Sequence, residues 1–208
     1  MILGITGSIA TGKSLVSKFF VDLGAHLIDW DVLGHEVMQP KKEAWQGIVE
    51  YFGKDVLNED STINREVLGR LVFNKPDRLS RLNEIVHPEI MKVDQKLVNE
   101  IRGETPCALI VKEIALMSER GKRLLVDKAV VVCSSEENQI KRLAERGISE
   151  EDAKLRIRAQ LPMTEKLKLA DFVINNDGTK EETKKQVEII YNQVHFSQRK
   201  NNCKSTVA

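Results

Sequence analysis

Close to its start the chain reads Gly7-Ser8-Ile9-Ala10-Thr11-Gly12-Lys13-Ser14, which matches the pattern G-x-x-x-x-G-K-[ST] at every fixed position. A short apolar run precedes this stretch, and apolar residues at helical spacing follow it. A strand, a glycine-rich loop and a helix in this order are typical of a phosphate-binding loop. An ordinary glycine turn would not explain why Lys13 and Ser14 follow Gly12. The stretch therefore predicts a nucleotide site, with Lys13 at the β- and γ-phosphates and Ser14 as a ligand of Mg²⁺.

The rest of the chain continues the alternation of strands and helices that the loop begins. Short apolar runs predict β-strands at residues 2–6, 26–28, 108–111, 129–133 and 172–174. Helical stretches lie between them, and Gly24 is expected to end the first helix. Strands that alternate with helices form a parallel sheet with helices on both faces. The predicted fold class is α/β, a P-loop NTPase core with a doubly wound five-stranded parallel sheet.

Composition narrows the class of protein. The 208 residues carry 32 basic and 31 acidic side chains, so a net charge of +1 offers no electrostatic case for nucleic acid or membrane binding. No apolar run approaches the ~20 residues needed to cross a bilayer, and no signal peptide is recognisable. Cys107 and Cys133 sit in apolar runs and are expected to be buried, reduced thiols. We therefore expect a cytoplasmic protein with no nucleic acid or membrane partner.

A phosphate-binding loop does not define the reaction. A GTPase switch would carry a DxxG stretch after a later strand and an NKxD motif that reads the base, and the sequence is interpreted as carrying neither. An ATPase motor would carry an acid at the end of an apolar strand, which Val126-Asp127 fits poorly because a strand follows it. The remaining class is the nucleotide and metabolite kinases, which hold Mg²⁺ largely through substrate phosphates and water. A nucleotide-dependent switch without enzymatic activity stays open as an alternative.

Asp29 and Asp31 are the candidates for the acceptor side. They lie two residues apart after the second predicted strand, so in extended backbone both side chains would point to one face. The crevice beyond the carboxyl ends of parallel strands is where such sheets bind ligands. A carboxylate there could accept the proton of an acceptor hydroxyl. A solvated turn or a helix cap would use the same residues, and the sequence alone does not decide between these interpretations.

Basic residues after the fourth predicted strand are the candidates for closing over the nucleotide. Gln139, Arg142 and Arg146 recur at helical spacing, and Arg156 and Arg158 follow on a second predicted helix. Guanidinium groups at such positions could clamp a triphosphate. An exposed helix rich in Arg and Glu is the ordinary alternative, and it is favoured for Arg156 and Arg158.

These features together resemble the dephospho-CoA kinase family, up to about Val194. The resemblance rests on the order and spacing of short motifs rather than on any one of them. In chain order the motifs are residues 4–14, Leu23-Gly24, Leu27-Ile28-Asp29-Trp30-Asp31, Phe52-Gly53, Ile63-Asn64-Arg65, Ile85-Val86-His87-Pro88, Gln139-x-x-Arg142-Leu143-x-x-Arg146, Gln160 and Ala170-Asp171-Phe172-Val173-Ile174-Asn175-Asn176-Asp177-Gly178.

The resemblance implies transfer of the γ-phosphoryl group of ATP to the 3′-hydroxyl of dephospho-CoA, with Mg²⁺, as the last step of coenzyme A synthesis. It implies that Asp31 is the base, that Asp29 shapes the site or its metal shell, and that Lys13 and Arg142 act in catalysis. Arg65 and His87 would lie on the acceptor side, although a surface Arg and a helix-capping His remain open readings. The residues implied at the nucleotide are Gly7, Ser8, Ile9, Ala10, Thr11, Gly12, Lys13, Ser14, Leu15, Arg142, Arg146, Asn175 and Asn176, the last two near the adenine.

We expect one kinase domain over residues 1–195. Its parts would be a core (1–32, 103–135 and 166–195), a helical acceptor-binding region (33–102) and a helical lid (136–165). Gly53, Pro76 and Pro88 are expected to separate helices of the acceptor-binding region, with Asn64 capping one of them. The last helix is expected to end at about Val194, before a polar and disordered tail, 196–208. We expect a monomer or a small homo-oligomer.

Two positions depart from the family pattern. Trp30 replaces the small middle residue of the family's D-A-D motif and places a large ring beside the proposed base. The family's Pro-Leu-Leu-x-Glu motif appears as Ala115-Leu116-Met117-Ser118-Glu119, without the proline that makes a rigid turn. Both changes fall on the acceptor side, and neither touches the phosphate-binding loop.

Overall fold

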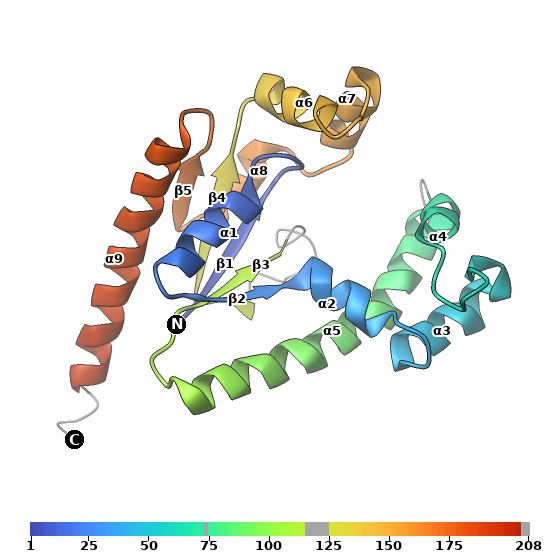
Figure 1. Cartoon of the computed structure of the whole chain (residues 1–208), viewed down its shortest axis with the longest axis horizontal. Helices are drawn as coiled ribbons and strands as arrows, with labels where there is room; N and C mark the ends of the chain where they lie inside the picture. The colour runs from blue at the N-terminus through green and yellow to red at the C-terminus, as the bar shows by residue number, and fades with distance from the viewer. Residues whose placement is uncertain (73–74, 115–124, 205–208) are drawn as a thin grey trace. The chain divides into compact units, whose positions relative to one another are not determined.

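The computed structural model describes residues 1–72, 75–114 and 125–204, which form two compact units. The core unit comprises Met1–Asp29 and Ile101–Ala208, and the helical unit comprises Trp30–Glu100. Within the described residues every named strand belongs to the core unit (Figure 1).

The core unit is built on a sheet of five parallel strands (Figure 1). The strands are β1 (Ile2–Gly7), β2 (His26–Asp29), β3 (Ile110–Glu113), β4 (Lys128–Cys133) and β5 (Phe172–Asn175), in the spatial order β2-β3-β1-β4-β5. β1 lies at the centre, with Ile5 level with Glu113 on one side and Val130 on the other. Because all strands run parallel, their carboxyl ends share one edge, and the loop that leaves β1 starts in the middle of that edge. The predicted α/β fold with a five-stranded parallel sheet is confirmed.

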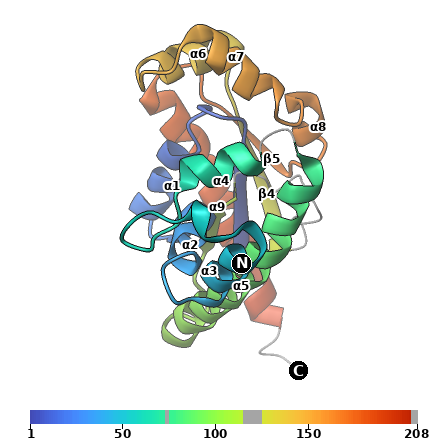
Figure 2. The same ribbon diagram turned by 90° about the vertical axis from the view of Figure 1, so that its right-hand side faces the viewer.

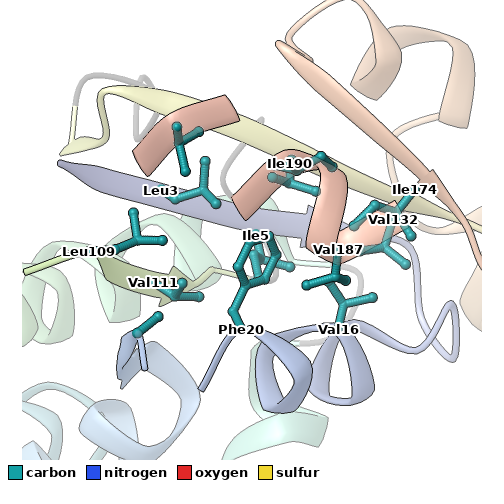
Figure 3. Packing of buried hydrophobic residues seen from close by; sticks show 13 residues of the cluster. Leu3, Ile5, Val16, Phe20, Leu109, Val111, Val132, Ile174, Val187 and Ile190 are labelled. Carbon is teal, nitrogen blue, oxygen red and sulfur yellow. The ribbon is translucent and has the colours of Figure 1, made fainter. Parts of the chain in front are cut away.

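Helices surround this sheet. Those that lie wholly in the core unit are α1 (Lys13–Asp22), α6 (Glu136–Ala144), α7 (Glu150–Arg158), α8 (Met163–Leu167) and α9 (Lys180–Lys204). Val16 and Phe20 of α1 and Val187 of α9 pack on one face of the sheet, against Leu3 and Ile5 of β1 (Figure 3). All five side chains are fully buried, and burying one of this size contributes about 1.5–3 kcal/mol. α8 packs against β4, and α6 and α7 lie against each other (Figure 2).

Strand β3 begins two residues later than the expected run, 108–111. It covers Ile110–Glu113 and so includes two charged residues, Lys112 and Glu113, which are 3% and 8% exposed. A buried charge requires polar partners, and Glu113 finds two hydroxyl groups on α1. The sequence pattern missed the end of the strand because the apolar run stops before the charged pair.

The two cysteines near these strands have different environments. Cys107 lies before β3 and is exposed, so the prediction of a buried thiol there is wrong. The reason is the later start of the strand, which leaves this residue in the preceding turn. Cys133 is half-buried at the end of β4, and burial raises the pKa of its thiol.

The helical unit consists of helices and turns, as predicted for this stretch. Its helices are α2 (Trp30–Val37), α3 (Glu43–Phe52), the short 3₁₀ helix η1 (Lys54–Val56), α4 (Arg65–Val72) and α5 (Pro76–Glu104), whose last turn belongs to the core unit. Asn64 caps α4, because its Oδ1 accepts a hydrogen bond from the backbone N–H of Val67 (3.0 Å). The predicted cap is therefore confirmed.

Pro88 lies inside α5 and does not end it. The prediction that Pro76 starts a new helix is confirmed, since α5 begins there, but the prediction that Pro88 separates two helices is wrong. Proline in a helix interior removes one backbone hydrogen bond and kinks the helix without necessarily breaking it. Val86 and Ile90 are buried on either side of Pro88, so packing holds the helix through this position.

The final helix is longer than expected. α9 runs from Lys180 to Lys204, so the prediction of an end at about Val194 and a disordered tail from residue 196 is wrong as far as Lys204. The stretch contains neither glycine nor proline, and nothing in it stops a helix. Among the helices of the described ranges, none combines the length and apolar character that crossing a membrane requires.

Candidate active site

The loop between β1 and α1 has the shape that phosphate binding requires. Gly12 has a φ of +95°, in the left-handed region, and a side chain there would collide with the amide of Asn176. A side chain at Gly7 would collide with the backbone carbonyl of Val132 in β4. α1 begins directly after this turn at Lys13, so the positive end of the helix and its first N–H groups face the loop. Only glycine fits at either position, which accounts for two of the fixed positions of the motif.

Lys13 extends back across the loop. Its ammonium group donates to the carbonyl oxygens of Gly7 (3.3 Å) and Ser8 (3.1 Å), at the other end of the loop from the start of α1. An ammonium group in a phosphate-binding loop acts on the β- and γ-phosphates of a nucleotide. This role of Lys13 stays a prediction, and the position of the ammonium group is compatible with it.

Ser14 and Ser17 share one buried carboxylate. The Ser14 hydroxyl donates to Oε1 of Glu113 (3.0 Å), and the Ser17 hydroxyl donates to Oε2 of the same residue (2.8 Å). Glu113 ends β3, the neighbour of β1, so its carboxylate lies beside the loop at the carboxyl edge of the sheet. Hydroxyl and carboxylate oxygens are the ligands that Mg²⁺ prefers, directly or through water. The pair formed by Ser14 and Glu113 therefore fits a magnesium ion.

Sequence reasoning did not identify Glu113. An acid at the end of an apolar strand was the expected signal, and Lys112 separates Glu113 from the apolar run. A second signal was available, because Ser14 and Ser17 are three residues apart and face the same side of a helix. Asp127, the acid considered instead, lies before β4 and accepts from the backbone N–H of Ile2 (2.7 Å). That contact lies at the opposite edge of the sheet from the loop. This position agrees with the interpretation that Asp127 is not the acid of an ATPase motor.

Arg142 binds the loop directly. Its Nη1 donates to the backbone carbonyls of Ala10 (3.1 Å) and Thr11 (3.2 Å) and to the Ser134 hydroxyl (3.2 Å). Its Nη2 donates to the backbone carbonyl of Asn176 (2.6 Å). A planar guanidinium group with several donors can hold several carbonyls at once. Helix α6 is thereby tied to the loop, and any catalytic role of Arg142 would have to operate from this position.

Helices α6 and α7 also contact the tip of the loop through apolar side chains. Ala10 forms a small buried cluster with Leu143 of α6 and Ala153 of α7, and Ile9 packs against it. The predicted lid residue Arg146, just beyond α6, does not join these contacts and is exposed. Arg156 and Arg158 on α7 are exposed as well, as the favoured interpretation of an ordinary surface helix expects.

Asn176 joins the loop to α9. Its Nδ2 donates to the carbonyl of Thr11 (2.8 Å), its Oδ1 accepts from the Thr183 hydroxyl (2.8 Å), and the residue is 4% exposed. Asn175 is exposed, and its Oδ1 accepts from the backbone N–H of Asp177 (2.8 Å). A position of both asparagines near an adenine stays a prediction, and the structure adds that Asn176 fixes the loop.

Asp177 holds the start of α6. Its Oδ1 accepts hydrogen bonds from the Ser134 hydroxyl (2.7 Å), the Ser135 backbone N–H (2.7 Å) and the Asn138 side-chain amide (2.9 Å). Desolvation acts to raise the pKa of this carboxyl, but the donors outweigh it and lower the pKa to about 2. The turn after β5 therefore contacts the loop through Asn176 and α6 through Asp177.

The two candidate acids on the acceptor side lie in different secondary structures. Asp29 is the last residue of β2 and is half-buried, whereas Asp31 lies in the first turn of α2 and is exposed. The prediction that both occupy extended backbone is wrong, because the helix begins between them at Trp30 and ends the strand alternation. A carboxylate in a first helical turn interacts favourably with the helix dipole.

His35 connects α2 to α4 within the helical unit. Its Nδ1 donates to the backbone carbonyl of Asp31 (2.9 Å), and its Nε2 accepts from the Arg65 guanidinium group. A carbonyl only accepts and a guanidinium group only donates, so these partners assign the ring proton to Nδ1. The structure thus brings Arg65, the first residue of α4, to the helix that carries Asp31. His87 lies half-buried inside α5, so the alternative reading of a helix-capping His is wrong.

Trp30 is a core residue of the helical unit. It is 5% exposed, and its indole N–H donates to Oδ1 of Asp94 (3.0 Å), a buried residue of α5. The large ring is therefore accommodated by burial, with its polar group hydrogen-bonded. The altered segment 115–119 lies outside the described residues.

Two stretches match the letters of GTPase motifs. Asp31-Val32-Leu33-Gly34 reads DxxG, and Asn74-Lys75-Pro76-Asp77 reads NKxD. The first lies in α2, after the edge strand β2. Of the second, Asn74 lies outside the described residues, and Pro76 and Asp77 open α5. Both motifs are therefore present in the sequence, so the interpretation that it carries neither is wrong.

Comparison with sequences of known proteins agrees with this geometry. A family model described as dephospho-CoA kinase matches residues 1–182. A dephospho-CoA kinase of Syntrophus aciditrophicus (strain SB) is 43% identical over 193 residues, which are 92% of this chain and 82% of the relative.

Solved structures give the same result. A dephospho-CoA kinase from Campylobacter jejuni superposes with a TM-score of 0.69 at 27% identity, covering 94% of this chain and 98% of that chain. The protein TT1252 from Thermus thermophilus superposes with a TM-score of 0.80 at 29% identity, covering 93% and 97%. A shikimate kinase from Acinetobacter baumannii, solved in complex with shikimate, has a TM-score of 0.54 at 13% identity, covering 93% and 92%. This last likeness is one of fold alone.

Proposed function

Because the chain belongs to the dephospho-CoA kinase family, we propose that it transfers the γ-phosphoryl group of ATP to the ribose 3′-hydroxyl of dephospho-CoA, giving CoA and ADP. The match of the family model to residues 1–182 carries the choice of acceptor. A phosphate-binding loop alone would not, since one fold serves many acceptors.

The nucleotide half of the proposal rests on the core unit. The N–H groups of the loop and of the first turn of α1 would bind the β- and γ-phosphates, with Lys13 neutralising the charge that develops during transfer. Ser14 and Glu113 would hold Mg²⁺, which neutralises and orients the phosphates when bound. Arg142 would act by fixing the loop carbonyls it contacts, so that the loop amides keep their orientation. Positions of Arg146, Asn175 and Asn176 at the nucleotide rest on the resemblance alone.

The acceptor half of the proposal names four residues. Asp31 would accept the proton of the 3′-hydroxyl, and Asp29 would shape the site. Arg65, which contacts His35, and His87 would bind charged groups of the acceptor, because a molecule that carries a diphosphate requires basic partners. Little covalent chemistry falls to the protein in phosphoryl transfer, so these residues would contribute mainly by positioning.

The proposed domain organisation follows the division into a nucleotide half and an acceptor half. Residues 33–102 would form the acceptor-binding region and residues 136–165 the lid. A lid that excludes water from the transferring phosphoryl group limits wasteful hydrolysis of ATP. We propose the cytoplasm as the place of action and a monomer or small homo-oligomer as the working form.

The test measures ADP release from Mg·ATP alone and with each of three acceptors: dephospho-CoA, shikimate and AMP. Stimulation by dephospho-CoA, and by neither of the others, is the expected result. Stimulation by a different acceptor, or by none while ATP still binds, would overturn the choice of acceptor and leave the nucleotide half standing. Absence of ATP binding would overturn both halves.

A further inference from the structure

We infer that Gln160 and Lys166 fix the first half of the phosphate-binding loop and act as positioning residues for ATP. The inference rests on the nucleotide half of the proposed function and extends it. Gln160 belongs to the motifs that carry the family resemblance, but no role follows from that resemblance. Lys166 belongs to none of those motifs.

The two side chains contact consecutive residues of the loop. Oε1 of Gln160 accepts from the backbone N–H of Ile9 (2.9 Å) and from the Lys166 ammonium group (3.3 Å). The same ammonium group donates to the Ser8 hydroxyl (3.2 Å). Gln160 lies just after α7, and Lys166 lies on α8. A single segment, distant in sequence from the loop, therefore holds both of these loop residues.

The contact between Lys166 and Ser8 is buried, and this burial restricts movement of the loop. Lys166 is 1% exposed and Ser8 is 6% exposed, so water cannot replace the hydrogen bonds between them. A buried ammonium group is costly unless its donors are satisfied. Moving Ser8 or Ile9 away from this segment would therefore disrupt the polar contacts of a buried charge.

The contacts also determine which loop amides can bind an anion. The N–H of Ile9 is directed at Gln160 and that of Thr11 at the Ser8 carbonyl (3.4 Å), so the phosphate-binding amides are among the remaining ones of the loop and the first turn of α1. Further along, Arg142 holds the carbonyls of Ala10 and Thr11. Two anchors thus fix residues 8–11, one from the segment after α7 and one from α6. Fixing a loop in its binding conformation reduces the ordering that binding must otherwise supply.

The test compares Lys166→Met and Gln160→Leu with the parent full-length protein. Lys168→Met is the matched control, because Lys168 lies two residues from the buried lysine, is exposed and pairs with Glu165. ATP affinity is measured by calorimetry without acceptor, together with kcat, KM for ATP and Tm. Both test variants are expected to raise the Kd and KM for ATP about fivefold or more while kcat stays within about threefold. Lys168→Met is expected to match the parent.

Two further variants keep the inference open to contradiction if a core substitution prevents folding. Ser8→Ala removes the acceptor of Lys166 from the loop and is expected to raise the Kd for ATP. Gln160→Glu retains an acceptor for Ile9 and Lys166 and is expected to recover most of the affinity that Gln160→Leu loses. A lower Tm with an unchanged Kd for ATP in Ser8→Ala and Gln160→Leu would show a purely structural role and overturn this inference alone. A parent protein unable to bind ATP would overturn the proposed function as well.

Discussion

The hydroxyl group of Ser14 donates to Oε1 of Glu113 at 3.0 Å, which ties the first turn of α1 to the end of β3. Glu113 is buried, and its second oxygen accepts from Ser17. The last fixed residue of the loop motif is therefore hydrogen-bonded to a carboxylate at the end of a neighbouring strand. Two oxygen groups of the kind that Mg²⁺ prefers meet where the terminal phosphates of a nucleotide are expected.

Replacing Glu113 with Gln is expected to raise the Mg²⁺ concentration for half-maximal turnover about tenfold or more, because outer partners of a metal ligand tune its affinity by that order. The measurement is ADP release over a magnesium titration at saturating ATP. Ser17→Ala is the control, since it removes a contact to the other carboxylate oxygen and leaves the Ser14 contact in place. A magnesium dependence that is the same in Glu113→Gln and the parent would contradict the assignment.

Replacing Arg142 with Lys is expected to lower the free energy of unfolding by about 2 kcal/mol and to weaken ATP binding, because one ammonium group cannot reach all four acceptors of the guanidinium group. Urea unfolding and ATP calorimetry measure the two effects. Arg146→Lys, at an exposed position just beyond α6, is the control. If Arg142→Lys instead lowers kcat with stability and ATP affinity intact, Arg142 acts on the transferring group and is not an anchor.

Replacing Asp31 with Asn is expected to reduce kcat about 100-fold or more, the usual contribution of a positioned base, while the Kd for ATP stays unchanged. Steady-state kinetics with dephospho-CoA and calorimetry with ATP separate these quantities. Glu36→Gln, an exposed acid on the same helix, controls for the loss of a surface charge. Full kcat in Asp31→Asn would remove Asp31 from the role of base.

The contribution of Asp177 to stability is expected to disappear in acid. Its pKa is lowered to about 2 in the folded state from an ordinary value of 3.8, so the unfolded chain binds this proton more readily. The stabilisation is complete above the unfolded pKa and is lost as the pH falls through the folded pKa. The difference in unfolding free energy between the parent and Asp177→Asn should therefore stay constant from about pH 7 to about pH 5 and shrink as the pH falls from about 4 to about 2.

Urea unfolding over that pH range measures the difference directly. Asp22→Asn, on the exposed side of α1, controls for the removal of a surface carboxylate. A difference between the parent and Asp177→Asn that stays constant across the range would mean that the carboxylate does not hold α6 as the hydrogen bonds indicate.

The fold and the loop could be predicted from the sequence because both depend on short-range patterns. The strands are short apolar runs, and their alternation with helices leaves few arrangements of a parallel sheet. Gly7 and Gly12 are required where a side chain would collide with neighbouring groups. The same local reasoning identified Asn64 as a helix cap.

Contacts between distant parts of the chain could not be predicted in this way. Arg142 on Ala10, Lys166 on Ser8 and Asn176 on Thr11 join residues more than 130 positions apart. The helical spacing of basic residues and the family resemblance indicated that Arg142 is a lid residue. Neither of them predicted the four groups that accept its hydrogen bonds. Lys166 gave no signal at all, since an isolated lysine in a charged segment is normally exposed.

Local rules also failed where tertiary packing decided the backbone. Pro88 should end a helix, but buried neighbours on both sides hold α5 together through it. Asp31 was expected in extended backbone, but α2 begins at Trp30, whose indole N–H is satisfied by Asp94 more than sixty residues away. The burial of Val86 and Ile90 and the contact of Trp30 with Asp94 both depend on tertiary packing, so neither correction could be made without the structure.

The most direct test of the central claim identifies the product. The protein is incubated with Mg·ATP and dephospho-CoA, the acceptor is analysed by mass spectrometry, and the phosphorylated position is established by ³¹P NMR, with Lys13→Ala as the control. We expect a product heavier by one phosphoryl group, carried on the ribose 3′-hydroxyl, and no such product from the variant. Release of ADP at the same rate with and without dephospho-CoA, with no heavier product, would contradict the central claim.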